Sequence, residues 1–161
     1  MKRSIVLFAF LLVAFAAQNG IAQTQKQFVL QTARALETAP LDKETQKMRG
    51  DALRWVIETD EVSIIACGGV FSTILEKKNK NGTDMTGAYM IGMAAYKIQN
   101  PEKAVDENAA QLAGIELSLK VYKALVKEKP KTKFEPIEAL IVKRNNGELA
   151  ALIAAADCGK K

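Results

Sequence analysis

The sequence predicts an all-α fold: a single domain of about six helices, packed as an orthogonal or antiparallel helical bundle, that follows a cleaved signal peptide. Apolar residues recur at intervals of three and four along most of the chain. Prolines and turn clusters, such as residues 79–82 and 145–147, separate these periodic segments. The length of 161 residues fits one domain, and no linker divides it.

Residues 1–22 have the features of a secretory signal peptide. Two basic residues precede an uncharged apolar run over residues 5–17, and Ala22 ends a small-residue cleavage signal. The run is too short for a membrane-spanning helix, which needs roughly 20 apolar residues. We therefore expect cleavage before Gln23 and an exported all-helical domain over residues 23–161, located in the periplasm or secreted.

Two amphipathic helices are expected next. Residues 25–38 place Phe28 on an apolar face opposite Gln and Arg side chains, and Pro40 ends this segment. A second helix can begin at that proline, because the first helical turn tolerates proline. This helix directs Trp55 and Val56 to one side, so we assign the single tryptophan to packing.

The segment over residues 62–78 fits two structures. Its β-branched start is compatible with a short strand. Apolar side chains at helical spacing, including Ile64 and Phe71, favour a helix, which is our prediction. Gly68 and Gly69 each cost a helix roughly 1 kcal/mol relative to alanine, so we expect a kink or a closely packed backbone there.

A helix is predicted from a cap at Thr83 or Asp84 to about Gln99. Methionines and tyrosines recur along it at intervals of four, four and three. This spacing places them in one stripe: Met85, Tyr89, Met93 and Tyr96. Such a stripe is typical of a core face. The alternative is a binding stripe for an apolar ligand or a partner helix, because thioethers adapt in shape and phenols carry a polar group.

The longest helix, over residues 106–129, is predicted to be central because it is apolar on more than one face. Pro130 ends it, and shorter helices over residues 134–144 and 148–156 complete the chain. Lysines concentrate around the end of the long helix and form a possible basic patch: Lys120, Lys123, Lys127, Lys129, Lys131 and Lys133. The patch is either a solvated face that offsets the helix dipole or a contact for an acidic partner.

The chain has two cysteines, Cys67 and Cys158. Thiols in an oxidising compartment tend to pair, so we predict one disulfide between them. Closing so long a loop stabilises the folded state by roughly 4–5 kcal/mol in the chain-entropy model. The competing interpretation is a buried structural Cys67 and a loose Cys158 near the C-terminal lysines.

Composition excludes several classes of activity. The chain contains no histidine, which removes catalytic triads, His-containing zinc sites and haem ligation by imidazole. No phosphate loop or metal-ligand spacing is present, so no cofactor is implied. The mature chain is only mildly basic and its lysines lack interleaved aromatics, which argues against nucleic acid as a partner. An enzyme would depend on carboxylates such as Glu58, Asp60, Glu61 and Glu116.

Two resemblances follow from these features. The layout of signal peptide, small helical body and disulfide resembles that of small exported immunity proteins against type VI secretion amidases, and that of periplasmic acid-stress chaperones. The apolar stretch from Tyr89 to Ala95 is similar to a glycine-containing helix of the immunity group, and Cys158 matches its near-terminal cysteine. Other cysteines of that group are missing here. Residues 119–130 are similar to the second helix of a tetratricopeptide unit, without its repeat period.

We expect a non-catalytic binding module, such as an inhibitor, an immunity factor or a chaperone. Its expected partner is another envelope or secreted protein, and an anionic envelope polymer or lipid is a second partner class for the basic patch. The rival function is a small cell-envelope hydrolase that uses carboxylates as acid and base. Experiments can distinguish these two functions. A binding module forms a stoichiometric complex with its partner, whereas a hydrolase turns over a substrate.

Cleavage of the signal peptide and pairing of the two cysteines can be tested together. Protein recovered from its own envelope fraction without reductant should begin at Gln23, and its intact mass should be about 2 Da lower than that of the reduced form. Intact-mass spectrometry before and after reduction measures both. A chain that retains Met1, or one whose mass does not rise on reduction, would contradict the predicted compartment.

Overall fold

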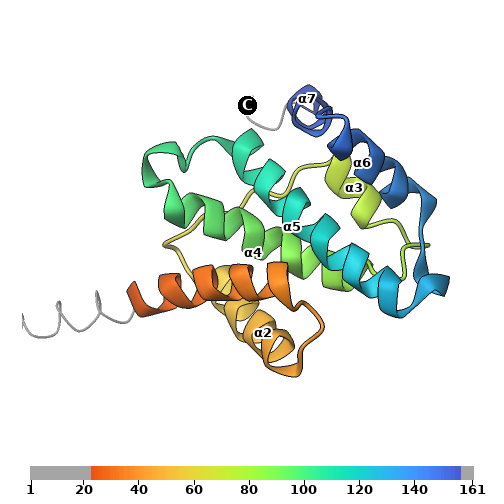
Figure 1. The fold of residues 1–161 in the computed structure, drawn as a ribbon. Coiled ribbons are helices and arrows are strands. Elements are labelled where there is room, and N and C mark those ends of the chain that lie inside the picture. Colours follow the sequence, from red (N-terminus) through yellow and green to blue (C-terminus); the bar gives the residue numbers. More distant parts are fainter. Residues whose placement is uncertain (1–22, 157–161) are drawn as a thin grey trace, which may run out of the picture.

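The computed structural model describes residues 23–156, and this part of the chain is a single all-helical domain without a strand (Figure 1). The predicted fold class is therefore confirmed. The predicted signal segment and Cys158 lie outside the described residues. Seven α-helices and two short 3₁₀ helices occur: residues 23–38, α2 (Lys43–Glu58), α3 (Val70–Ile74), α4 (Gly82–Gln99), η1 (Pro101–Lys103), α5 (Glu107–Glu128), η2 (Pro130–Thr132), α6 (Glu135–Asn145) and α7 (Leu149–Ala155).

Helices α4 and α5 run antiparallel through the middle of the domain and make the most extensive contact between any two elements (Figure 1). On one side, α3, α6 and α7 cover a core that includes Tyr89 and Tyr122. On the other side, the helix over residues 23–38 and α2 cover a second core that includes Ile91 and Val121. The prediction that the long helix is central, with neighbours on two faces, is confirmed.

Two glycines set how closely the central helices approach. A Cβ atom added at Gly114 would lie 2.7 Å from the carbonyl oxygen of Tyr89 and 2.9 Å from Cγ of Met93. A Cβ atom added at Gly92 would lie 2.9 Å from the Cα atom of Gly114. Ser118 adds a buried hydrogen bond of 2.7 Å from its hydroxyl to the carbonyl of Met85. The backbones thus meet without an intervening side chain.

Aspartates determine where two of the helices begin. Asp42 accepts hydrogen bonds from the backbone N–H groups of Glu44 and Thr45, which places the start of α2 after Pro40. Asp106 caps α5 by accepting from Ala109. The predicted cap of α4 is wrong, because that helix already begins at Gly82 and its N-cap, Asn81, makes no capping bond. The carboxylate of Asp84 pairs instead with Arg49.

The predicted helix over residues 62–78 is wrong. Residues 63–67 are neither helix nor strand, and the helical part is limited to the five residues of α3. Gly69 has φ +62°, a left-handed conformation that interrupts any helix entering from residue 67. An added Cβ atom at Gly69 would lie 2.6 Å from Cβ of Ala156, whereas the nearest atom to one added at Gly68 is the Ser72 hydroxyl at 3.6 Å, so close packing occurs at Gly69 and involves a side chain.

Contact between Gly69 and Ala156 also bears on the predicted disulfide. These residues lie two positions after Cys67 and two positions before Cys158, respectively. The end of α7 therefore packs against the segment that carries Cys67. This arrangement is compatible with the predicted pairing, which stays a prediction because Cys158 lies outside the described residues.

Tyr122 connects the central helix to α6. Its buried hydroxyl donates to Glu138 at 2.8 Å and accepts from the backbone N–H of Phe134 at 2.8 Å. Burial and the neighbouring carboxylate raise the pKa of Tyr122 to about 12, although the hydrogen bond from Phe134 opposes the shift.

None of the helices among residues 23–156 combines the length and apolar composition that crossing a membrane requires.

The close approach of the central helices is tested by a pair of glycine substitutions. Gly114→Ala should lower the free energy of unfolding by about 1–3 kcal/mol, because the methyl group collides with the backbone of Tyr89. Gly50→Ala is the matched control: nothing lies within 4 Å of the added atom in α2, so it should raise stability by up to about 1 kcal/mol. Urea denaturation measures both. Equal effects of the two substitutions would contradict the packing.

Candidate functional site

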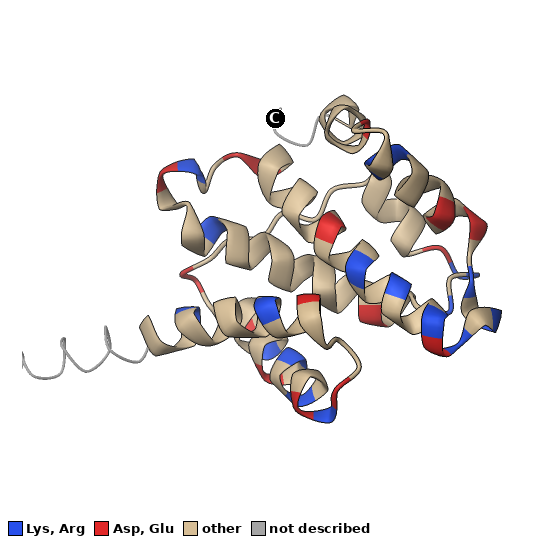
Figure 2. Cartoon of the chain, in the orientation of Figure 1, with Lys and Arg blue, Asp and Glu red and all other residues tan. Residues whose placement is uncertain are grey.

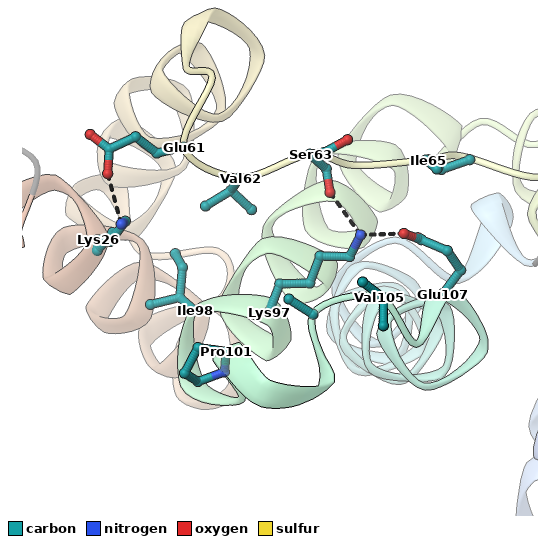
Figure 3. Close-up of a pocket in the computed structure, with 11 residues that line it drawn as sticks. Lys26, Glu61, Val62, Ser63, Ile65, Lys97, Ile98, Pro101, Val105 and Glu107 are labelled. Carbon is teal, nitrogen blue, oxygen red and sulfur yellow. Dashed lines mark hydrogen bonds and ion pairs between the residues drawn. The ribbon is translucent and has the colours of Figure 1, made fainter.

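A pocket of about 580 Å³ lies where the chain after α2, the end of α4, η1 and the start of α5 meet (Figure 3). Lys26 adds the helix over residues 23–38, so five separate segments supply its walls. Aliphatic side chains form most of the lining: Val62, Ile65, Ile98, Pro101, Ala104 and Val105. The volume lies within the range of roughly 300–1,000 Å³ that is usual for binding pockets.

A buried ion pair links the segments around this pocket. The Lys97 ammonium is bound to the Glu107 carboxylate, and the two side chains are only 5% and 10% exposed. Lys97 also donates to the backbone carbonyl of Ser63 at 2.8 Å (Figure 3). One cation thereby joins α4, α5 and the non-helical segment. The second oxygen of Glu107 is buried without a hydrogen-bond partner among the described residues.

Two large aliphatic side chains stand exposed at the pocket. Val105 is 89% exposed between η1 and α5, and Ile65 is 45% exposed on the opposite segment. Both belong to a small group of exposed large hydrophobics within residues 23–156. An ion pair of 2.7 Å between Lys26 and Glu61 adds a polar part to the lining. The combination of exposed aliphatic groups with fixed charges suits contact with another molecule.

The Met/Tyr stripe does not form part of this surface. Met85, Tyr89 and Met93 are fully buried, and the Tyr89 ring stacks on Phe71 with ring centroids 4.2 Å apart. Tyr96 is partly exposed and lines a different groove. Burial raises the pKa of Tyr89 to about 12; the backbone of Cys67 lowers it in part, and the negative charge of Glu107 adds to the rise. Three members of the stripe therefore lie in the core, and Tyr96 lies at its edge.

The basic patch is largely exposed, which both a solvated face and a contact for an acidic partner require. Lys120 is engaged with Glu37, and Lys133 lies 3.8 Å from both Glu135 and Glu138. The remaining predicted members are exposed: Lys123, Lys127, Lys129 and Lys131. None of the six lines the pocket around Lys97.

The structure does not bring together the four acids that the sequence predicts for a carboxylate enzyme. Glu61 lines the pocket and pairs with Lys26, whereas Glu116 on α5 pairs with Arg144 on α6. Glu58 and Asp60 are not among the residues that line the pocket. Within residues 23–156, no group of three or more cysteine, aspartate or glutamate side chains is arranged to hold a metal ion.

Comparison with known proteins found no match to any family model, curated protein or solved structure. The residues of the pocket itself were missed by sequence reasoning. Lys97 carried one available signal, a lone charge near the end of an otherwise apolar helix. Val105 and Glu107 carried none, because exposure and pairing at a helix junction depend on neighbours distant in sequence.

The buried ion pair gives a testable prediction on stability. Lys97→Met should lower the free energy of unfolding by about 3–5 kcal/mol, because it leaves the Glu107 carboxylate buried without its counter-ion. Adding Glu107→Leu should recover most of that loss, since a buried pair is often replaceable by apolar residues. Thermal and urea denaturation of the single and double variants measure the coupling. Additive losses in the double variant would contradict the assignment.

Proposed function

We propose that the protein is an exported binding module that acts by stoichiometric contact with another envelope or secreted protein, as an inhibitor, an immunity factor or a chaperone. The observation that carries the proposal is the exposure of Val105 and Ile65 beside a mostly aliphatic pocket. Large aliphatic side chains exposed at a concave site mark contact surfaces more often than isolated ones do. The partner is therefore expected to insert an apolar side chain.

The ion pair supports the proposal by keeping the pocket in shape. Lys97 ties the segment of Ser63 to both central helices, so the wall that carries Ile65 is held before a partner arrives. A preorganised surface loses less conformational entropy on binding, which raises affinity without additional contacts. The lysine has its hydrogen bonds committed inside the protein, so apolar contact rather than this charge is expected to dominate recognition.

A carboxylate hydrolase is less well supported. Glu61 and Glu116 lie in different places, and each is engaged by a cation. Glu61 shares the pocket with Glu107, but Lys97 holds that second carboxylate, so both acids of the pocket are committed to ion pairs. Hydrolysis by a pair of carboxyl groups requires an acid and a base that flank one scissile bond. No observation on the described residues favours that function over binding.

Substitutions of two exposed valines test the proposal. Val105→Asp should weaken a complex by about tenfold or more, because it removes an apolar contact at the pocket, while the folded structure persists. Val142→Asp is the matched control, since Val142 is 57% exposed on α6 and does not line the pocket. Crosslinking in the native envelope, followed by mass spectrometry, measures the yield of the complex for both variants and the unaltered protein.

Each result decides the proposal. A single protein recovered in stoichiometric amount with the unaltered chain and with Val142→Asp, but lost with Val105→Asp, supports it. Equal recovery with Val105→Asp would show that the pocket is not the contact. The absence of any stoichiometric complex, together with turnover that Glu61→Gln or Glu116→Gln abolishes, would favour the hydrolase instead.

A further inference from the structure

Two lysine-rich segments that are distant in sequence meet at one end of the domain. Residues 75–81 connect α3 to α4, and residues 129–134, which include η2, connect α5 to α6. The side chain of Asn81 donates to the backbone carbonyl of Thr132 at 3.0 Å and holds the two segments together. Figure 2 shows the blue of the basic residues gathered where they meet. We call this the lysine end: Lys77, Lys78, Lys80, Lys129, Lys131 and Lys133.

Charge is strongly segregated in this molecule. The two segments contain six lysines and a single acid, Glu76. In the rest of residues 23–156, acidic side chains outnumber basic ones. The modest net charge of the chain therefore conceals a concentrated positive field at one end, and such a field attracts anionic surfaces over about a Debye length, roughly 10 Å at moderate salt.

The lysine end has the properties of a diffuse contact and not of a pocket for one anion. All six ammonium groups are on exposed residues, and only Lys133 has an ion pair with another described residue. No arginine contributes a planar fork for bidentate phosphate binding. Hydrated lysines on flexible stems suit a surface that carries many spread negative charges.

An exposed leucine lies next to these lysines. Leu75 is 57% exposed, and Leu75 and Lys77 together line a shallow groove of about 410 Å³. An exposed aliphatic side chain at the edge of a lysine-rich segment matches the interface of a lipid bilayer, where acyl chains accept the leucine and headgroups accept the charges. A soluble polyanion would offer no apolar region for that leucine. This observation favours lipid over polymer.

We propose that the lysine end binds the surface of an anionic lipid bilayer, with Leu75 entering the interface between headgroups and acyl chains. The contact is peripheral and reversible. It does not use the pocket around Val105, so a protein partner and a bilayer engage separate parts of the domain.

Vesicle binding tests the proposal with a matched pair of triple variants. The protein as processed in its own cells is mixed with vesicles of phosphatidylglycerol and phosphatidylcholine in equal parts, and the bound fraction is measured by sedimentation. Lys77→Gln/Lys78→Gln/Lys80→Gln should lower the partition coefficient about 100-fold. The control variant removes the same total charge from exposed lysines elsewhere in the domain: Lys43→Gln, Lys47→Gln and Lys103→Gln. It should lower the partition coefficient only slightly.

Further measurements distinguish binding to a lipid bilayer from binding to a soluble polyanion. Leu75→Ser should lower the partition coefficient about tenfold while leaving all charges in place. Binding should disappear on phosphatidylcholine vesicles and at about 0.5 M salt. Equal losses for the two triple variants would overturn the proposal. So would equally tight binding to soluble polyglutamate with no effect of Leu75→Ser, because the surface would then recognise charge without a bilayer.

Discussion

The close approach of α4 and α5 is the constraint on which the rest of the structure depends. Gly92 and Gly114 let the two backbones meet directly. The central helices can lie this close only because neither residue carries a Cβ atom. All other helices then pack on the two outer faces of this pair. A change of spacing at the glycines would shift both cores together, because closely packed interiors transmit displacement.

The buried ion pair extends this central contact to the surface. Lys97 lies near the end of α4 and Glu107 at the start of α5, so their pairing fixes the junction between the central helices. The same ammonium group holds Ser63 and with it a segment that has no regular secondary structure. Desolvation makes such a pair costly unless its geometry is maintained. The shape of the pocket is thus determined by the core of the protein and not by its loops alone.

The pocket and the lysine end lie at opposite ends of α4. This helix has 18 residues and is therefore about 27 Å long. The pocket is at its C-terminal end and the lysine end adjoins Asn81 at its start. With both proposals combined, the domain would rest on a bilayer by one end and present the pocket away from it. A protein partner near the same membrane would then meet the pocket at a raised local concentration.

Local rules determined the helical fold, because periodicity, caps and breakers act over a few residues. The sequence alone identified the central helix because it is apolar on more than one face, and the predicted range of residues 106–129 is close to the observed α5 with its N-cap at Asp106. It failed over residues 62–78, where Gly69 and the bond from Lys97 to Ser63 outweigh helical spacing. It also left open whether the Met/Tyr stripe faces the core, since periodicity does not say what covers a face.

The pocket and the lysine end could be found only from the tertiary structure. Lys97 and Glu107 are ten residues apart, but their burial depends on the segment of Ser63, which is 34 residues from Lys97. The lysine end exists because Asn81 reaches Thr132 across 51 residues of sequence. Contacts of this range are set by how whole helices pack, and no local pattern encodes them. The sequence therefore determined which elements form, and packing determined which side chains they bring together.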